Sequence, residues 1–246
     1  MNELQKERYA RHLVLGEIGE AGQETLLRSN VLVVGAGGLG SPAAFYLAAA
    51  GIGTIGLMDG DRVDLSNLQR QILHTTDSPG QLKVESATQR LLALDPGISI
   101  KTYPFRLTGE NAREILPGYD FVIDATDNFD SKFLIAKACH DAGKPYSHAG
   151  IREFHGQTMT VRPAETTCYR CIFHEDGVPS GNIPRGPVGA LAGIIGSIQA
   201  MEAIKVLLSI GDLLYNALLT CDTLTMSFRK IPLSRDPECP FCGTGK

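Results

Sequence analysis

A run of glycines near the start of the chain has the composition of a phosphate-binding turn: Gly35, Gly37, Gly38 and Gly40. An apolar run at 31–34, typical of a buried parallel strand, leads into it, and an apolar helical stretch at 41–50 follows. Glycines let the backbone approach a phosphate closely, and the first turn of a helix offers unpaired N–H groups. Asp59 follows Gly40 at close to the ~20 positions expected for an acid that binds a ribose. The stretch therefore predicts a nucleotide site, in which Asp59 fits NAD as readily as ATP.

A second group of polar residues follows the ends of apolar runs that we predict to be strands. Its members are Asp59, Asn67, Arg70, Lys83 and Asp127. In a doubly wound sheet such positions meet at one edge, above the glycine turn. A nucleoside triphosphate needs cations for its phosphates and a carboxylate for Mg²⁺, and this group offers both. Each residue taken singly is more simply explained as a surface charge or a helix cap, so the prediction of a triphosphate site rests on their joint placement.

Lys83 occupies an unusual position for a cation. It falls in the first turn of a helix that we predict over 80–93, where the helix dipole disfavours positive charge, so we expect a bound anion nearby. The chain has no G-x-x-x-x-G-K-[ST] motif, and this excludes a P-loop ATPase. The terminal run 243–246 contains Gly and Lys but lacks the spacing of that motif. A nicotinamide-dependent oxidoreductase is an alternative, although it leaves Arg70, Lys83 and Asp127 without a task.

Four of the six cysteines form two Cys-x-x-Cys pairs, Cys168 with Cys171 and Cys239 with Cys242. Two such pairs supply the four thiolates of a tetrahedral structural Zn²⁺ site. We expect His174 to be a solvated loop histidine, with a role as a competing ligand as the alternative. No thioredoxin-like strand and helix surround either pair, which disfavours the alternative of redox dithiols. A Cys₄ site keeps no open position, so we expect a zinc clip that ties the C-terminal region to the sheet.

The elements that position these residues follow from the apolar pattern. Predicted strands cover 31–34, 54–58, 98–103, 120–124, 144–149, 156–162 and 214–230. Predicted helices cover 3–14, 21–28, 41–50, 80–93, 108–115 and 129–142. Up to residue 150 the alternation predicts an α/β fold with a doubly wound, mainly parallel, Rossmann-like sheet, and the last two strands are expected to add to it antiparallel. In the first helix we expect a buried face made of Leu4, Tyr9, Leu13 and Val14.

The composition is that of a globular protein, with 43% hydrophobic and 20% charged residues and a net charge of −4. There is no basic excess for nucleic acid and no basic amphipathic helix for a membrane surface. The polar N-terminus does not resemble a signal peptide. The apolar stretch 186–210 carries Gln199, Glu202 and Lys205 at helical spacing, which favours a buried core helix over a membrane span. We therefore expect a cytoplasmic protein.

Seven motifs occur in a characteristic order. They are Arg8-Tyr9-x-Arg11, Gly35-x-Gly37-Gly38-x-Gly40, Asp59-x-Asp61, Ser66-Asn67-Leu68-Gln69-Arg70-Gln71, Lys83-Val84-Glu85, Thr126-Asp127-Asn128, and Cys168-Tyr169-Arg170-Cys171 with Cys239-x-x-Cys242. As a set, covering nearly the whole chain, they resemble the MoeB/ThiF/HesA family, the bacterial relatives of ubiquitin-activating enzymes. The resemblance implies an adenylyltransferase that uses ATP and Mg²⁺ to adenylate the C-terminal glycine of a small ubiquitin-like sulfur-carrier protein ending in Gly-Gly, with release of pyrophosphate.

The resemblance also implies roles for individual residues. Asp59 would hold the ribose, Asp127 the Mg²⁺, and Asn67, Arg70 and Lys83 the phosphates. The full nucleotide site would comprise Gly35, Gly37, Gly38, Gly40, Asp59, Asp61, Ser66, Asn67, Leu68, Gln69, Arg70, Lys83, Asp127 and Asn128. Arg11 would reach the triphosphate of a neighbouring subunit, so the active species would be a homodimer with Arg11, Arg70, Lys83 and Asp127 as catalytic residues. The chain would be one domain, divided into N-terminal helices 1–29, a nucleotide-binding core 30–150 and a carrier-binding and zinc region 151–246.

One feature departs from part of that family. The thiamine branch, which the stretch Leu107-Thr108-Gly109-Glu110 resembles, carries a cysteine in the loop before the long apolar helix. Here the loop 172–186 has none, and Asn182 stands about where it would be. We therefore expect the enzyme to stop at the acyl-adenylate and to leave sulfur delivery to a separate donor.

The sequence leaves the substrate open. Carriers for molybdopterin, thiamine or another sulfur metabolite, and a peptide substrate, all fit the sequence. A non-catalytic carrier-binding relative is a further alternative, against which the intact catalytic set argues.

Overall fold

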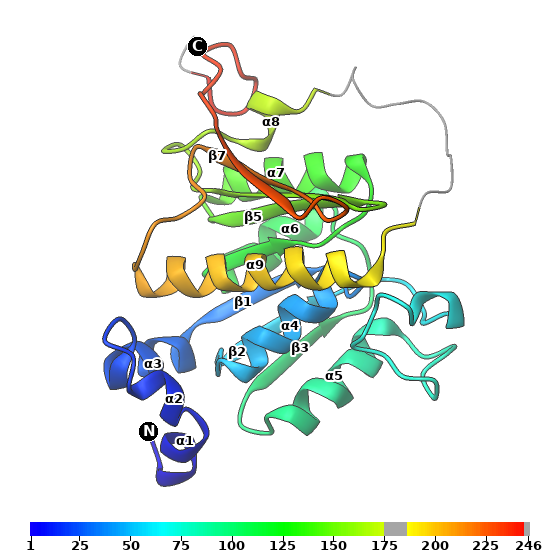
Figure 1. Cartoon of the computed structure of the whole chain (residues 1–246), viewed down its shortest axis with the longest axis vertical. Helices are drawn as coiled ribbons and strands as arrows, with labels where there is room; N and C mark the ends of the chain where they lie inside the picture. Colours follow the sequence, from blue (N-terminus) through cyan, green and yellow to red (C-terminus); the bar gives the residue numbers. More distant parts are fainter. Residues whose placement is uncertain (175–185, 244–246) are drawn as a thin grey trace.

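An eight-stranded sheet forms the centre of the computed structural model, which describes residues 1–174 and 186–243 (Figure 1). Its strands are β1 (Asn30–Val34), β2 (Thr54–Met58), β3 (Ser99–Tyr103), β4 (Phe121–Asp124), β5 (Tyr146–Arg152), β6 (His155–Val161), β7 (Ala217–Asp222) and β8 (Ser227–Pro232). They lie in the order β3-β2-β1-β4-β5-β6-β7-β8. The pairs among β1 to β5 are parallel, and β5 to β8 pair antiparallel. The predicted sheet is confirmed.

The centre of the parallel part is a topological switch point. β1 pairs with β2 on one side and with β4 on the other. The register places Val34 beside both Met58 and Asp124, so the carboxyl ends of the three strands reach the same edge. In open α/β sheets, ligands bind in the crevice outside such strand ends.

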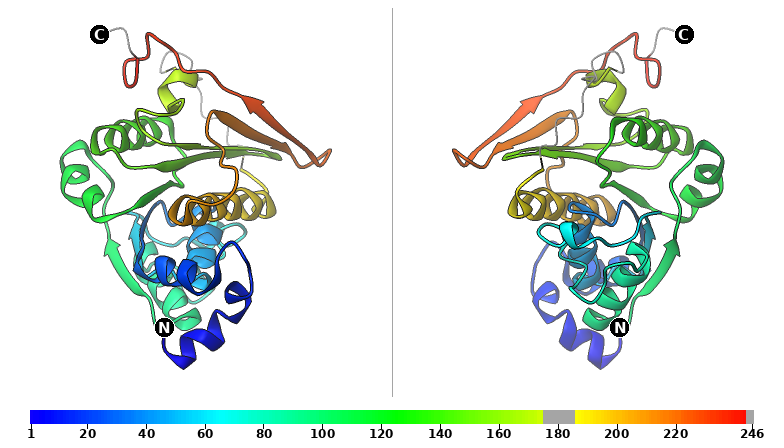
Figure 2. Two further views of the ribbon diagram at one scale, coloured as in Figure 1. Left: turned by 90° about the vertical axis from the view of Figure 1, so that its left-hand side faces the viewer. Right: turned by 90° about the vertical axis from the view of Figure 1, so that its right-hand side faces the viewer.

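Helices cover both faces of the sheet (Figures 1 and 2). One face carries α3 (Gly19–Arg28), α4 (Gly40–Ala49), α5 (Lys83–Leu94) and α9 (Gly189–Leu208), which build one apolar cluster with β1 and β2. The other carries α6 (Gly109–Ile115) and α7 (Phe129–Ala142), which build a second cluster with β4 and β5. Short elements complete the chain: α1 (Glu3–Arg8), α2 (Ala10–Leu13), η1 (Leu65–Asn67), η2 (Leu116–Gly118) and α8 (Tyr169–Ile172).

The long apolar helix α9 packs against α4 and against β4, β5 and β6. By length and composition it is the one helix, within the described part of the chain, that is long and apolar enough to cross a membrane, and 56% of its most apolar 18-residue window is buried. Its Glu202 carboxylate is 2% exposed and accepts hydrogen bonds from Thr160 Oγ1 at 2.6 Å and Leu214 N at 2.7 Å. These contacts are those of the predicted core helix.

The N-terminal prediction was partly wrong. The expected helix 3–14 is broken at Tyr9 into α1 and α2. The phenol of Tyr9 is buried and donates to Asp95 Oδ2 at 2.6 Å, whereas Leu4 is 65% and Val14 77% exposed, and Leu13 is half-buried. Two short helices anchored through one inserted side chain cannot bury a continuous apolar face.

The predicted strand 214–230 is a hairpin, β7 and β8, rather than one strand. The Asp222 carboxylate accepts hydrogen bonds from Leu224 N and Thr225 Oγ1, both at 3.0 Å, and Met226 has a left-handed φ of +52°. This side-chain turn chemistry reverses the chain inside an otherwise β-favouring run. The helix predicted over 80–93 begins only at Lys83, and the short α8 was not predicted.

A charged cluster is buried between β4, β5 and α7. It consists of Asp124, Lys132 and His148, which are 1%, 7% and 1% exposed. Asp124 Oδ2 lies 3.2 Å from Lys132 Nζ and 3.1 Å from His148 Nδ1. Burial opposes ionisation of Asp124, but the Lys132 charge and hydrogen bonds from His148 and Thr126 lower its pKa to about 2. Burial, together with the Lys132 charge, lowers the pKa of His148 to about 4, so His148 is neutral and donates Nδ1–H to Asp124.

The His148 pKa predicts an acid-dependent loss of stability. Between about pH 6.5 and pH 4 the unfolded chain binds a proton at His148 that the folded chain excludes. The free energy of unfolding should therefore decrease as the pH is lowered through this window, by up to about 3 kcal/mol at 1.36 kcal/mol per pKa unit. Asp124 stays ionised throughout the window. Urea unfolding at pH 7 and pH 4.5 measures the effect. His148→Gln should flatten this dependence, and His155→Gln, at an exposed site, should preserve it; equal pH dependence in wild type and His148→Gln would contradict the account.

Candidate active site

A cavity of about 1290 Å³ lies at the carboxyl edge of the parallel strands and continues over the antiparallel ones. Nine of the predicted site residues line it: Gly35, Gly37, Gly38, Asp59, Asp61, Arg70, Lys83, Asp127 and Asn128. They come from the segments that follow β1, β2 and β4 and from the start of α5. Of the five polar residues predicted to converge above the glycine turn, Asp59, Arg70, Lys83 and Asp127 line this cavity and Asn67 does not.

The glycines of the turn have two different tasks. Gly35 has φ +102°, and a β-carbon there would lie 2.7 Å from the carbonyl oxygen of Ala125. A β-carbon on Gly40, the first residue of α4, would overlap the carbonyl oxygen of Gly35. A β-carbon on Gly37 would meet only Gln71 Nε2, at 3.7 Å, and one on Gly38 would touch the Arg70 stem at 3.4 Å. The outer glycines are required by packing, whereas Gly37 and Gly38 leave the backbone open toward the cavity.

The backbone N–H and C=O groups of Ala36, which lies between Gly35 and Gly37, are both held by hydrogen bonds. Ala36 N donates to Asp59 Oδ2 at 2.9 Å, and Ala36 O accepts from His74 Nε2 at 3.0 Å. His74 is 5% exposed, and burial lowers its pKa, so it is a neutral structural donor. His74 was missed from the sequence because a single histidine after a polar segment carries no pattern. The second oxygen of Asp59 accepts from Asp61 N at 2.8 Å.

The anion expected beside Lys83 is supplied by the protein itself. Lys83 Nζ lies 3.1 Å from Asp61 Oδ2 and 3.7 Å from Asp59 Oδ2, with only 9% of the lysine side chain exposed. Arg106 approaches the other oxygen of Asp61 at 3.4 Å. Burial raises the pKa of Asp61, but hydrogen bonds and charge from Lys83 and Arg106 outweigh it and lower that pKa. Two carboxylates therefore offset the unfavourable helix dipole at Lys83.

Asp127 stands on the loop between β4 and α7 with its side chain exposed to the cavity region. Its Oδ1 accepts a 3.5 Å contact from Asn128 Nδ2. Asn128 is the N-cap of α7, since its Oδ1 accepts from Ser131 N at 2.9 Å. Asn128 thus caps α7 and also borders the cavity.

Several predicted site residues lie outside this lining. Of the described residues, those that do not contribute to it are Arg11, Gly40, Ser66, Asn67, Leu68 and Gln69. Asn67 Oδ1 accepts from the backbone N–H of Asp64, the N-cap of η1, at 3.1 Å and so completes a capping box. Gln69 Nε2 contacts Pro187 O at 3.4 Å. Arg11 is exposed on α2, at the N-terminal end of the molecule in Figure 1. Asn182 lies outside the described residues.

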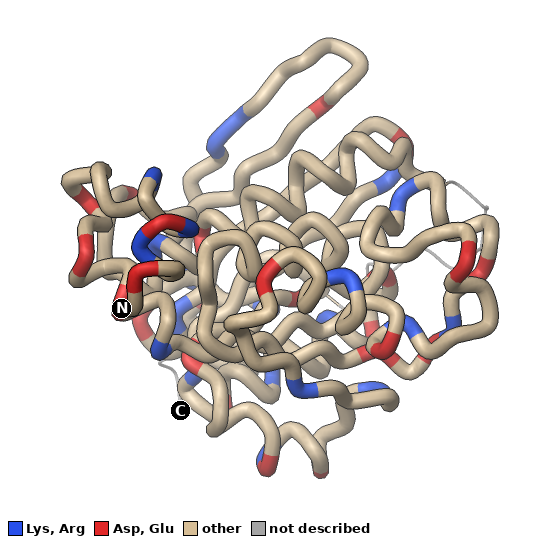
Figure 3. Tube along the Cα trace, turned by 90° about the horizontal axis from the view of Figure 1, so that it is seen from below, with Lys and Arg blue, Asp and Glu red and all other residues tan. Residues whose placement is uncertain are grey.

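Sequence reasoning missed the far half of the cavity. Its lining includes Arg152 from β5, His155 and Gln157 from β6, and Arg229 from β8. These residues become neighbours only through antiparallel pairing, which places Arg152 opposite His155. Acidic and basic residues are interspersed along the trace (Figure 3), so recognition of an anion depends on the few cations at the cavity rather than on a field of one sign.

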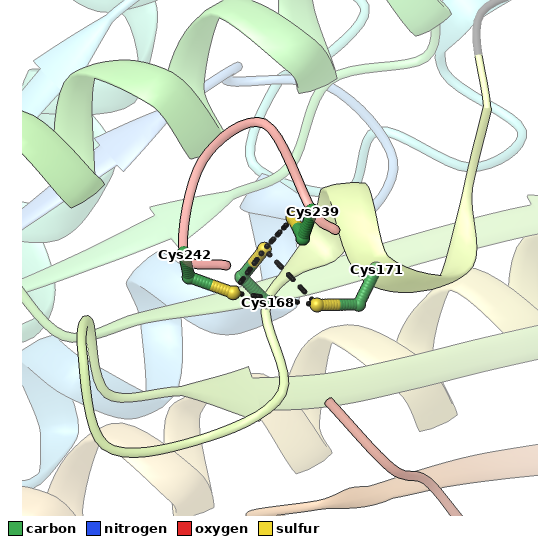
Figure 4. Close-up of side chains that lie close together, drawn as sticks. All are labelled: Cys168, Cys171, Cys239 and Cys242. Carbon is green, nitrogen blue, oxygen red and sulfur yellow. Dashed lines mark hydrogen bonds between the residues drawn. The ribbon is translucent and has the colours of Figure 1, made fainter. Parts of the chain in front are cut away.

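The two cysteine pairs lie side by side, one at α8 and the other in the segment that follows β8 (Figure 4). Cys168 Sγ lies 3.6 Å from Cys171 Sγ, 3.5 Å from Cys239 Sγ and 3.4 Å from Cys242 Sγ, and all four residues are buried. These separations exceed the ~2.05 Å of a disulfide and approach the ~3.8 Å edge of a tetrahedron with 2.3 Å metal–sulfur bonds. A β-carbon on Gly243 would lie 2.6 Å from Cys239 O, so the second knuckle requires glycine. The cluster fits a tetrahedral thiolate site.

Comparison with known proteins identifies close relatives of this chain. The sulfur carrier protein adenylyltransferase of Thermus thermophilus is 46% identical over 246 residues, covering 96% of this chain and 90% of that protein. The SAMP-activating enzyme E1 of Haloferax volcanii is 43% identical over 245 residues, covering 98% and 90%. The probable adenylyltransferase/sulfurtransferase MoeZ of Mycobacterium tuberculosis is 41% identical over 254 residues. The match covers 96% of this chain and 64% of that longer protein.

Solved structures and a family model agree with these relatives. The crystal structure of E. coli MccB with ATP matches with a TM-score of 0.86 over 99% of this chain and 75% of that one, at 24% identity, which establishes the fold. The model of the ThiF family matches residues 9–241. The resemblance drawn from the motifs is thereby confirmed, and the chain belongs to the ThiF family.

Proposed function

We propose that this protein is an ATP-dependent adenylyltransferase that activates the C-terminal glycine of a small ubiquitin-like sulfur carrier. The observation that carries the proposal is one continuous cavity, which joins the glycine turn and the residues Arg70, Lys83 and Asp127 to the face of the antiparallel strands. A nucleotide and an extended chain end can therefore meet in one space. Relatives named as a sulfur carrier protein adenylyltransferase and a SAMP-activating enzyme support the same reaction.

At the nucleotide end, the residues offer what a bound triphosphate requires. Gly37 and Gly38 leave room for a close phosphate approach, with Asp59 for the ribose and Arg70 and Lys83 for the phosphates. We propose Asn67 as a further phosphate contact, although it lies outside the cavity lining. A Lys–phosphate contact at ~4 Å is worth on the order of 4 kcal/mol at intermediate dielectric. Asp127 fits a Mg²⁺ ligand because its carboxylate is exposed and accepts only a long contact among the described residues. Bound there, Mg²⁺ would offset charge on the phosphates.

The reaction needs positioning more than covalent chemistry. A carboxylate oxygen of the carrier's terminal glycine attacks the α-phosphorus of ATP, the bond from that phosphorus to the bridging oxygen breaks, and pyrophosphate leaves. Arg70 and Lys83 stabilise the negative charge that grows on the leaving group, and no protein nucleophile is required. The product is a carrier acyl-adenylate, which a separate sulfur donor then attacks.

The wider setting follows from the same chemistry. Arg11 is exposed and outside the described cavity lining, which suits a residue that completes the site of a second copy, so we propose a homodimer. A cytoplasmic location supplies ATP, Mg²⁺ and the reduced thiols that the cysteine cluster needs. The buried cluster of Cys168, Cys171, Cys239 and Cys242 would hold a structural Zn²⁺. We treat the whole chain as one catalytic unit.

Asp127→Ala should remove the Mg²⁺ ligand without disturbing the fold, because the side chain is exposed. Carrier-dependent ATP–pyrophosphate exchange should fall at least about 100-fold. Asp130→Ala is the matched control, since Asp130 is also exposed on the first turn of α7 but does not line the cavity, and it should keep wild-type exchange. Near wild-type exchange in Asp127→Ala would refute the assigned role.

Zinc should be present at one ion per chain and should be lost in Cys239→Ser. The free energy of unfolding should then drop by at least about 3 kcal/mol, because folding energy comes from the metal–thiolate bonds. Elemental analysis and urea unfolding measure both effects. Cys139→Ala, at a buried cysteine outside the cluster, should retain the zinc. Full zinc content in Cys239→Ser would show that the ion lies elsewhere.

The missing loop cysteine predicts that no thioester forms at the loop 172–186. Intact-mass spectrometry of the enzyme after turnover with ATP and carrier should show the free chain alone. A species heavier by the mass of the carrier and cleaved by thiols would mean that another cysteine replaces the loop residue, and the proposed stop at the acyl-adenylate would be wrong.

A further inference from the structure

The loop that carries Asp127 is tied to a carboxylate inside the core. Asp124 Oδ1 accepts hydrogen bonds from Thr126 N at 3.1 Å and from Thr126 Oγ1 at 2.6 Å. Thr126 immediately precedes Asp127, whose own side chain is exposed. The position of Asp127 over the cavity therefore depends on how firmly Asp124 holds its neighbour.

Asp124 is itself held from three sides. Lys132 Nζ, on α7, lies 3.2 Å from its Oδ2 and also donates to Ala149 O of β5 at 2.6 Å. His148 Nδ1 lies 3.1 Å from the same oxygen. On the opposite face of the sheet, Gln199 Nε2 of α9 donates to the Asp124 carbonyl at 2.9 Å. The end of β4 is thereby clamped to α7, β5 and α9.

Removing Lys132 would leave a buried carboxylate without a counter-charge. Such a group must take up a proton, admit water or move, and each change weakens its acceptance of the two Thr126 hydrogen bonds. We propose that Lys132 and Asp124 are positioning residues, whose buried ion pair fixes Thr126 and, through it, the Asp127 carboxylate that binds the Mg²⁺ of Mg·ATP. This inference rests on the proposed function of Asp127.

The test compares two lysines of the same helix. Lys132→Met removes the buried cation, and Lys137→Met removes an exposed one that pairs with Asp141 at 2.6 Å. Calorimetry measures binding of ATP with excess Mg²⁺ and binding of ATP with EDTA. Lys132→Met should weaken Mg·ATP binding by about 10-fold or more, the usual effect of losing a residue that orients a metal ligand. ATP binding in EDTA should stay close to wild type, and Lys137→Met should match wild type in both.

A second variant covers the case in which Lys132→Met does not fold. Thr126→Val keeps the branched shape and the charge balance but loses the hydroxyl that Asp124 accepts, so it should reproduce the Mg·ATP defect. Thr126→Ser should restore binding, and near-ultraviolet circular dichroism confirms the fold of each variant. In a double-mutant cycle, adding Lys132→Met to Asp127→Ala should cost little further, because both act through one carboxylate.

Three results would overturn the inference. Folded Lys132→Met and Thr126→Val that bind Mg·ATP like wild type would show that the ion pair does not position Asp127. An equal loss of binding with Mg²⁺ and with EDTA would assign Lys132, which borders the cavity, to direct nucleotide contact or general stability. Failure of the wild-type protein to bind Mg·ATP would instead contradict the proposed function, and this inference with it.

Discussion

A carboxylate buried at the end of a central strand cannot stand alone in a low-dielectric core. Asp124 is 1% exposed and ends β4, the strand that joins the two halves of the parallel sheet. Its charge requires the cation of Lys132 and the imidazole of His148, which lie on α7 and β5. This one requirement locks the strand end, the following helix and the neighbouring strand into a single arrangement. The loop between β4 and α7, which borders the cavity, is therefore held at both of its ends.

The same logic governs the other side of the cavity. The backbone of Ala36 is held by Asp59 and His74, and Lys83 is held by Asp59 and Asp61. Groups fixed in this way need little reorganisation when a charged ligand arrives, which is how electrostatic stabilisation becomes effective in catalysis. The cavity then continues over the antiparallel strands, where the chain end of the proposed carrier would have room to approach a bound nucleotide. The proposed activation of a carboxylate requires this combination of fixed charges and open access.

Local patterns predicted the parts of the structure that depend on local physics. The glycine turn, the apolar parallel strands and the two cysteine pairs are each set by residues close in sequence, and all were found. His74, Lys132 and His148 were not, because their roles arise from contacts across 38, 8 and 24 positions that no periodicity marks. The split of the predicted strand 214–230 has a related cause, since the Asp222 side chain overrides a run with high β-propensity.

The central claim is that the chain activates the terminal carboxylate of a sulfur carrier. The most direct measurement is ATP–pyrophosphate exchange with Mg²⁺, comparing a carrier that ends in Gly-Gly with the same carrier lacking those two residues. The account predicts exchange with the intact carrier and none above background with the truncated one. An absence of exchange with every diglycine-ended carrier tested, in a protein shown to bind Mg·ATP, would contradict it and favour a carrier-binding relative without catalysis.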